Sequence, residues 1–307
     1  MRSHFFLFFL ILTLGILSCK SDNSKADVPE VEALEKSFLE NPTEENFNAI
    51  IATLADLFRS TPTKEEKRRF ILKGIELSKT HNKDQVYHIF IKEYIRYFHG
   101  DSMAADYLWE LAEYLDKNGS GETSEILKAG FMSSFPSDAR SQTIGEDQLK
   151  IVSDIDGLIR SKAEAIFVNP DQTGLNPDAV RHYIDICEAV VLAYPEEPMA
   201  GEYLFRAAEM ARSMRSFQKS MSLYDWILTS YPDFDKAAMV FFLQGFIFEN
   251  EFKQKDKAAA VYKTFLEKYP NDPMVPDVRF LLDNIDKTED EMLKLIEERQ
   301  KAKATDQ

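Results

Sequence analysis

An aromatic residue followed by proline recurs along this chain at a nearly constant interval. The dipeptides fall at Tyr194-Pro195, Tyr231-Pro232 and Tyr269-Pro270, spaced 37 and 38 residues apart. Counting back in a step of 37 from Phe135-Pro136 leads to Phe98-His99, and a further step leads to Thr61-Pro62. A fixed period of this length is typical of folds that stack one short structural unit. The interval constrains the fold more than any other feature of the sequence.

Residues with helical spacing precede these positions, which we call the marks, and all of them except Ser220 are apolar or aromatic. They stand eleven, seven and four positions upstream of five of them, in steps that mark one stripe of an α-helix. The stripes are Ile50, Leu54, Leu57; Tyr87, Ile91, Tyr94; Tyr183, Cys187, Val190; Ser220, Tyr224, Ile227; and Ala258, Tyr262, Phe265. Each helix is expected to end where proline cannot continue it.

A second recurring phrase supports the same period. The segments "MAADYLW" (103–109) and "MAGEYLF" (199–205) lie 96 residues apart, and each begins five residues after its aromatic mark. Each unit is therefore expected to be a pair of helices of about 37 residues, with acidic or Ser residues in the turn as N-caps of the next helix. Because strand-type alternation is poor throughout, we expect an all-α fold, an α-solenoid.

The end of the best-defined unit carries a family resemblance. Its pattern resembles the tetratricopeptide repeat (TPR) in Ala258, Tyr262, Phe265, Leu266, Tyr269 and Pro270. The longer turns resemble those of periplasmic TPR proteins, such as the TPR lipoprotein of the outer-membrane β-barrel assembly machinery and the Tol-Pal-associated division coordinator. The resemblance implies a right-handed superhelix of helix pairs that binds other proteins.

The TPR match varies along the chain. It is good across 178–285, where Ala208 and Gly245 stand at the small-residue position of the repeat. It is weaker across 43–136, where Ile75 occupies that position and Tyr87 replaces the small residue that Ala258 represents. The phase is lost between 137 and 177, because Phe135 and Tyr194 are 59 residues apart.

These observations predict an organisation for the whole chain. We expect a signal peptide over 1–18, a polar tether over 19–40, degenerate TPR-like helix pairs over 41–136, a hinge region over 137–177, TPR repeats over 178–287, and a capping helix and tail over 288–307. The hinge region is expected to contain one long helix at about 145–167, followed by a loop. The phrase "TEDE" at 288–291 is a capping-box pattern that would open the capping helix.

The first residues indicate where in the cell the protein is located. Arg2 precedes an apolar run over 5–17, which is shorter than the ~20 residues that a membrane-spanning helix needs. The following "ILSC" at 16–19 resembles the lipobox of bacterial lipoproteins, which implies lipid attachment at Cys19. The alternative is an ordinary signal peptide with an accidental cysteine. Lys20 after the cysteine favours the outer membrane in this family, on the periplasmic side or at the cell surface, where some Bacteroidota lipoproteins are exported.

Composition excludes some functions. The formal net charge is −15, which repels phosphate backbones, so nucleic-acid binding is not expected. The two cysteines, Cys19 and Cys187, do not form the clustered, even set of a disulfide framework.

No catalytic or metal-binding motif emerges. Cys187 with His182 and Asp185 suggests a cysteine hydrolase, but Cys187 belongs to a packing stripe and is interpreted as core. Asp154, Asp156 and Gly157 follow the spacing of a calcium loop, but the positions of its first and last ligands hold Val152 and Ala163. The Gly/Ser-rich segment 118–124 is interpreted as a turn within a unit. We expect no enzyme activity, no metal and no cofactor.

One column of aromatic residues is the candidate partner-binding groove. It consists of Trp109, Phe205, Phe242 and Phe280, each on the first helix of a unit. These residues could line a groove for a peptide, or they could be core between stacked helices. Polar residues one turn away would give the groove an acidic rim: Glu202, Glu209, Arg212, Asp106, Glu113, Glu249 and Asn250.

The leading functional prediction is a lipid-anchored cell-envelope scaffold that binds another envelope protein or peptide segment. It would serve outer-membrane or envelope assembly, an assignment that comes from the resemblance alone. The alternative is a glycan- or nutrient-binding surface lipoprotein.

Overall fold

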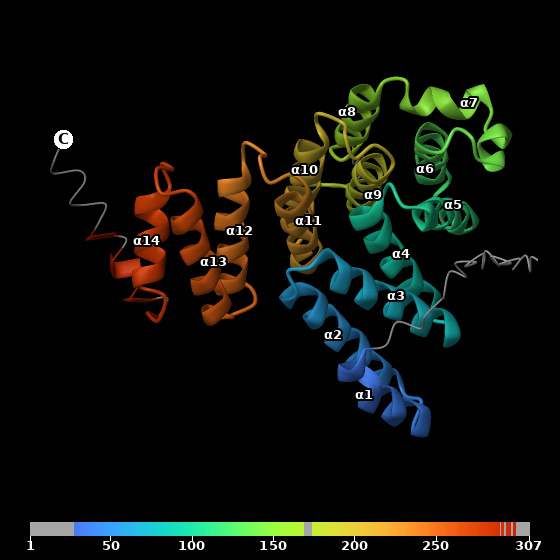
Figure 1. Ribbon diagram of the computed structural model, residues 1–307. Helices are drawn as coiled ribbons and strands as arrows, with labels where there is room; N and C mark the ends of the chain where they lie inside the picture. The colour runs from blue at the N-terminus through green and yellow to red at the C-terminus, as the bar shows by residue number, and fades with distance from the viewer. Residues whose placement is uncertain (1–27, 169–173, 289, 292, 296, 299–307) are drawn as a thin grey trace, which may run out of the picture. The chain divides into compact units, whose positions relative to one another are not determined.

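The protein is helical throughout the part that the structure, a computed structural model, describes. This part comprises residues 28–168, 174–288 and, within 290–298, all but 292 and 296. It contains fourteen α-helices and two short 3-10 helices and no strand, as the all-α prediction requires (Figure 1). The lipobox and its cysteine lie outside the described residues. The chain divides into two compact units, at Phe90 and Ile91 within α4.

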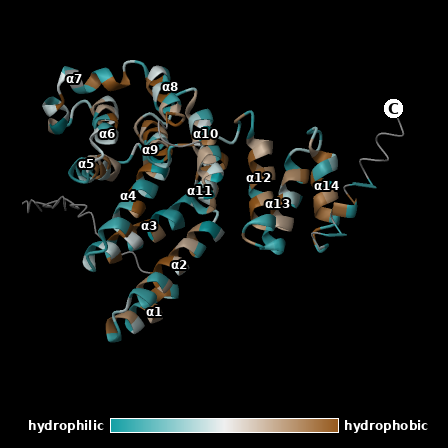
Figure 2. Ribbon diagram, turned by 180° about the vertical axis from the view of Figure 1, so that it is seen from behind, coloured by the Kyte–Doolittle hydropathy of each residue, from teal (hydrophilic) through white to brown (hydrophobic). Residues whose placement is uncertain are grey.

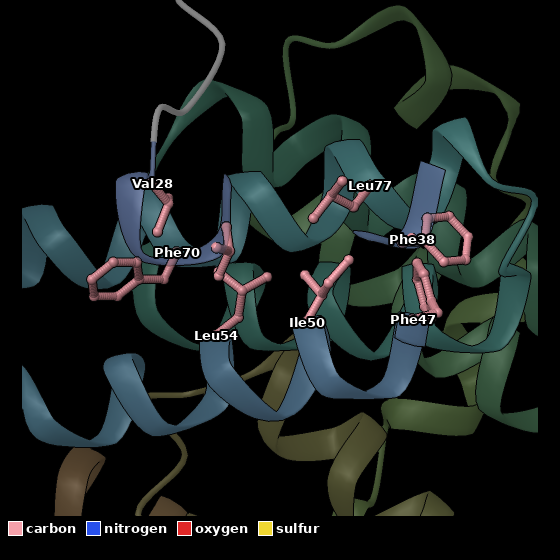
Figure 3. Packing of buried hydrophobic residues seen from close by; sticks show 8 residues of the cluster. Val28, Phe38, Phe47, Ile50, Leu54, Phe70 and Leu77 are labelled. Carbon is pink, nitrogen blue, oxygen red and sulfur yellow. The ribbon is translucent and has the colours of Figure 1, made fainter. Parts of the chain in front are cut away.

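The first unit is built from α1 (Pro29–Glu40), α2 (Glu44–Ser60), α3 (Lys64–Thr80) and the start of α4 (Asp84–Phe98). Helix α2 packs against both α1 and α3. Their facing stripes meet in one core, shown in Figure 3, whose labelled members are Val28, Phe38, Phe47, Ile50, Leu54, Phe70 and Leu77.

Helix α1 corrects the predicted tether, which was expected to extend from 19 to 40. Residues Pro29–Glu40 form a helix, with proline at the position where its missing N–H costs nothing. Val31 and Phe38 are buried, and Leu34 packs against the same core. Their spacing of three and four residues forms one apolar stripe, so this segment folds onto α2 instead of staying free.

The second unit stacks its helices largely in chain order. Its elements are the rest of α4 from Ile91 on, α5 (Ser102–Lys117), α6 (Gly121–Ser134), η1 (Ala139–Thr143), α7 (Glu146–Leu149), η2 (Lys150–Val152), α8 (Ile155–Ala165), α9 (Pro177–Ala193), α10 (Ala200–Ser213), α11 (Phe217–Ser230), α12 (Ala237–Asn250), α13 (Lys255–Lys268) and α14 (Val275–Asp283). From α9 to α14 each helix packs against the next. Figure 2 shows hydrophilic and hydrophobic residues alternating along the helices, as such packing requires.

The predicted packing stripes are confirmed. Every one of the fifteen side chains is buried, except that Leu57 is half-buried. Helices α6, α9, α11 and α13 end one residue before the aromatic mark. The α-solenoid of helix pairs follows from these two features, because each stripe is buried by the neighbouring helices.

Close approach at the small-residue position is also visible. A Cβ added to Gly245 would lie 2.3 Å from Cε1 of Tyr262, so only glycine lets α12 and α13 come this near. In the first unit the corresponding contact falls at Gly74 against Phe90, one residue before the Ile75 that the repeat register indicated. Gly74 stands 24 positions before Phe98, as Gly245 stands 24 positions before Tyr269, so the small-residue position here is Gly74 and not Ile75.

The N-caps follow the expectation in only some turns. Thr63 accepts a hydrogen bond from the backbone N–H of Glu66, and Asp101 accepts one from Met103. The cap positions of α10 and α12 are instead Met199 and Lys236, which make no side-chain cap bond. There the backbone of the turn supplies the acceptor: the N–H of Ala200 donates to Glu197 and that of Ala237 to Phe234, each at 2.9 Å.

The single long helix predicted over 145–167 is wrong. The chain there forms α7, η2 and α8, with a break at Asp154. The Asp154 carboxylate accepts from the N–H of Gly157 at 2.8 Å and so starts a new helix. Helix α6 packs directly on α9, with α8 also against α9. The repeat phase is lost because η1, α7 and η2 are inserted between α6 and α8.

The C-terminal capping box is confirmed. The backbone N–H and hydroxyl of Thr288 both donate to the Glu291 carboxylate, at 2.8 and 2.9 Å, and the N–H of Glu291 donates back to the Thr288 hydroxyl at 3.3 Å. None of the described helices is both long and apolar enough to cross a membrane.

Candidate binding face

The four column aromatics occupy equivalent places on the first helices α5, α10, α12 and α14. All four, Trp109, Phe205, Phe242 and Phe280, are half-buried. The sequence left open whether these side chains line a groove or form core, and the structure shows that they are neither fully buried nor fully exposed. Each ring packs partly against its own unit and remains partly accessible to solvent.

Trp109 is held on both its apolar and its polar side. Its ring packs edge-on against Phe131 of α6, with 5.1 Å between ring centroids. Its indole N–H donates to Glu113 at 3.0 Å, and the Arg140 guanidinium lies 5.9 Å from its ring centroid. Arg140 in turn pairs with Asp106 at 2.9 Å. These contacts fix the indole in one orientation.

Trp109 also forms one wall of a pocket of about 240 Å³. The pocket is lined by Trp109, Glu113, Asp116, Lys117, Lys128, Thr143, Ile144 and Gln148. Residues 143, 144 and 148 belong to the inserted segment after α6, so the insertion forms part of the pocket wall beside Trp109. The lining combines one aromatic surface with donors and acceptors, a composition suited to a small polar ligand.

Phe205 packs where two successive helix pairs of the second unit meet. Its ring centroid lies 6.4 Å from that of Tyr224 on α11 and 6.0 Å from that of Phe234 in the following turn. The Lys236 ammonium lies 5.1 Å from the same centroid, which adds a cation–π contact. One ring face is therefore already occupied within the protein.

The rim around Phe205 differs from the acidic rim that the sequence suggested. Glu202 binds Arg206 at 2.8 Å and Lys236 at 2.6 Å. Although partial burial opposes it, the cations lower the pKa of Glu202 below its ordinary value. Both carboxylate and cations are therefore charged, and their charges offset one another.

The negative charge of the second rim carboxylate, Glu209, is also offset by a neighbouring cation. Glu209 binds Arg212 at 2.6 Å and accepts a hydrogen bond from the Tyr224 hydroxyl. Burial opposes ionisation of Glu209, but these two partners keep its pKa below the ordinary value. On α12, Glu249 accepts from the Tyr262 hydroxyl at 2.8 Å, and the Asn250 amide donates to the Phe246 carbonyl at 3.1 Å.

Helix α12 exposes apolar side chains around Phe242 that sequence reasoning missed. Met239 and Phe246 are 38% and 39% exposed, and Leu243 is half-buried. Residues 239, 242, 243 and 246 share one side of the helix, and Phe242, at the edge of this side, also packs against the core formed with α13 and α14. Their signal was present in the sequence, because the positions 37 residues earlier around Phe205 are Glu202, Arg206 and Glu209.

Phe280 sits on the last regular helix. The Asn284 amide donates to its carbonyl at 2.8 Å, which closes the end of α14. The neighbouring Val278 is the fully buried residue of this helix, in a core with Tyr262 and Phe265.

The residues considered for catalysis do not form a catalytic arrangement. Cys187 is fully buried, and that burial raises the pKa of its thiol to about 12, so it stays protonated. The His182 Nε2 lies 2.7 Å from Glu122 on α6, and Asp185 is exposed. Cys187 is therefore a core residue, as its stripe predicted.

The calcium-loop residues have other partners. Asp154 is the N-cap of α8, and Asp156 accepts a hydrogen bond from the Tyr203 hydroxyl. Among the described residues, no cluster of His, Cys, Asp and Glu could hold a metal ion.

A buried carboxylate binds three helices of the second unit together. Glu188 on α9 is 5% exposed at its side chain and pairs with Lys92 of α4 and with Lys219 of α11, the latter at 2.7 Å. Burial alone would raise the pKa of Glu188, but the two lysines outweigh it and lower the pKa to about 2. This arrangement serves stability, because both lysines are consumed in holding the carboxylate.

Fold and face together define the class of protein: an all-α solenoid of helix pairs with a half-exposed aromatic column. Comparison of the chain with protein-family models finds no matching family, and comparison with curated proteins finds no match. The resemblance to TPR lipoproteins stays a prediction from the sequence motifs.

Proposed function

We propose that the protein is a lipid-anchored scaffold of the bacterial cell envelope, which holds another protein or peptide segment on its helical repeats. The observation that carries this proposal is the column of Trp109, Phe205, Phe242 and Phe280, half-buried at the same place on the first helices α5, α10, α12 and α14. Large, rigid aromatic side chains give much contact area at little entropic cost, and they are enriched where proteins bind one another.

The anchor part of the proposal rests on the lipobox alone. Lipid chains on Cys19 would hold the repeats at the outer membrane, on its periplasmic side or at the cell surface, with residues 20–27 as the link. Two acyl chains provide stable attachment, because each buried CH₂ contributes about 0.8 kcal/mol.

Two measurements in cells test the proposal. Cys19→Ser should move the protein from the membrane fraction to the soluble fraction; a variant that stays with membranes contradicts the anchor. Chemical crosslinking followed by purification should recover one defined envelope protein. That recovery should fall when Phe205 and Phe242 are both changed to Ser, in a variant whose thermal unfolding confirms that it is folded. Undiminished recovery contradicts the role of the column.

The Trp109 pocket favours a second candidate function, capture of a glycan or small nutrient. The pocket pairs an aromatic wall with Lys117, Lys128 and Gln148 as donors and Glu113 as an acceptor. Calorimetric titration with a panel of mono- and disaccharides tests it. Binding that Gln148→Ala abolishes supports capture; absence of binding by the whole panel counts against it.

A further inference from the structure

The exposed side of α12 is unlike the same side of any other first helix in the second unit. We call Met239, Phe242, Leu243 and Phe246 the α12 face. Two of its members are more than a third exposed, and the other two are half-buried. Contiguous apolar side chains that remain accessible on a folded protein mark sites of interaction.

The fold itself does not require an apolar residue at these positions. Helix α10 stands one unit earlier, and its equivalent residues are Glu202, Phe205, Arg206 and Glu209. Helix α10 buries its opposite side completely, through Tyr203, Leu204, Ala207, Ala208 and Ala211. Only the aromatic is common to the two helices. Three polar side chains on α10 are thus replaced on α12 by Met239, Leu243 and Phe246, with no gain in core packing.

Carboxylates stand at both ends of the α12 face. Asp233 and Asp235 are exposed in the turn before the helix, and Glu249 and Glu251 follow the face at its C-terminal end. Lys236 is engaged by Glu202 at 2.6 Å, and Arg215 pairs with Glu251 at 3.3 Å, which offsets part of the charge of Glu251. The whole chain carries a formal charge of −15. A partner that combines apolar and basic side chains is therefore complementary to this face.

We propose that the α12 face docks an amphipathic helical segment of the partner, with one apolar stripe flanked by Lys or Arg. The inference rests on the proposed scaffold function and names the chemistry of the partner. From Met239 to Phe246 the face spans about two helical turns, or roughly 10 Å. That length matches apolar anchors at positions i, i+3 or i+4, and i+7 of a docked helix. Basic residues at both ends of the stripe would meet Asp233 and Asp235 at one end and Glu249, beside the partly offset Glu251, at the other.

Synthetic peptides test the chemistry directly. The protein is residues 19–307 with Cys19→Ser, which contains every described residue. The probes are two fluorescein-labelled 18-residue peptides with the same Leu stripe, one with Lys and one with Glu at the flanking positions. Fluorescence anisotropy should show binding of the Lys peptide at least tenfold tighter than that of the Glu peptide. The difference in affinity between the two peptides should become smaller as the salt concentration is raised from 50 to 300 mM.

Variants assign the binding to the face. Phe246→Glu should weaken binding of the Lys peptide at least tenfold, and Met239→Glu serves as a second variant if the first unfolds. The matched control is Ile89→Glu, the same kind of change at an apolar side chain that is 61% exposed in the first unit. It should leave the affinity unchanged.

Other outcomes overturn the inference. Equal binding of the two peptides, no binding of either, or an affinity that Phe246→Glu leaves unchanged would each contradict it. A dimer of the wild type that Phe246→Glu dissociates in sedimentation would assign the face to a second copy of the chain. Binding to phosphatidylcholine–phosphatidylglycerol vesicles that Phe246→Glu abolishes would assign it to a bilayer. In all these cases the scaffold proposal is decided separately, by recovery of a crosslinked partner in cells.

Discussion

The hydroxyl of Tyr231 donates a hydrogen bond to the carbonyl oxygen of Pro195, at 2.9 Å. Both residues belong to aromatic-proline marks, one unit apart. The aromatic that closes one helix pair therefore reaches back to the turn that closed the pair before it. Burial, with a smaller contribution from Glu196, raises the pKa of Tyr231, so the hydroxyl keeps its proton. The aromatic-proline dipeptides that show the repeat in the sequence thus also form a hydrogen bond between consecutive helix pairs.

Loss of this hydroxyl should weaken the stack. Tyr231→Phe leaves the ring in place and removes one partly buried hydrogen bond, which should lower the free energy of unfolding by about 1 kcal/mol. Urea unfolding followed by circular dichroism measures the change. The control is Tyr269→Phe, because the Tyr269 hydroxyl makes no hydrogen bond with the described part of the chain. An equal loss in both variants would contradict the role of the Tyr231 bond.

The contact at Gly245 should be intolerant of one added methyl group. In Gly245→Ala the new Cβ would lie 2.3 Å from the Tyr262 ring, so α12 and α13 must move apart. We expect a loss of about 1–3 kcal/mol in unfolding free energy, despite the higher helix propensity of alanine. Gly100→Ala is the matched control, since nothing lies within 4 Å of a Cβ there, and it should be nearly neutral.

The architecture was predictable wherever the sequence repeats itself. The stripes before Tyr194, Tyr231 and Tyr269 located the second helices and their ends, because burial and proline act locally. Helix α1 was missed, although Val31, Leu34 and Phe38 carry a helical spacing, because the polar residues before them suggested a tether. The break at Asp154 was missed because apolar periodicity continues across it while the carboxylate starts a new helix.

Long-range partners of charged groups could not be predicted. The placement of the aromatic column on the first helices follows from the period. The pairing of the rim carboxylates with cations does not follow from the period, because Lys236 lies 34 residues after the Glu202 that it binds. Similarly, Lys92 and Lys219 stand 96 and 31 residues from Glu188. No local pattern identifies such pairs, since they arise only when helices from different units are packed.

The charge of Glu188 should matter for stability. Glu188→Gln leaves Lys92 and Lys219 close together without their anion, and we expect a loss of about 3 kcal/mol, the lower end for a buried pair because both lysines are partly exposed. Urea unfolding at pH 7 measures this loss. Lys263→Gln, at an exposed position on α13, is the control and should change stability little.

The same carboxylate predicts a pH dependence. The pKa of Glu188 is about 2 in the folded protein against an ordinary value of 4.5, so its contribution is complete above about pH 4.5 and is lost as the pH falls towards 2. The stability difference between wild type and Glu188→Gln should therefore shrink over this range. A difference that stays constant down to pH 2 would contradict the account.

The Cys187 thiol should be inert in the folded protein. Its burial raises its pKa to about 12, so at pH 8 it presents neither a thiolate nor an accessible sulfur. In residues 19–307 with Cys19→Ser it is the only cysteine. A thiol reagent should label no site in the native protein and one site in 6 M guanidinium. Rapid labelling of the native protein would reopen the question of a reactive cysteine.

Crosslinking at single positions in living cells tests the central claim most directly. A photoreactive amino acid is placed at 205, 242 or 246 on the first-helix side, or at 263 on the exposed surface of α13 as the control. The scaffold account predicts one discrete crosslinked product, with the same envelope protein in it, from 242 and 246 and none from 263. No product from the first-helix positions, or the same product from position 263, would contradict it.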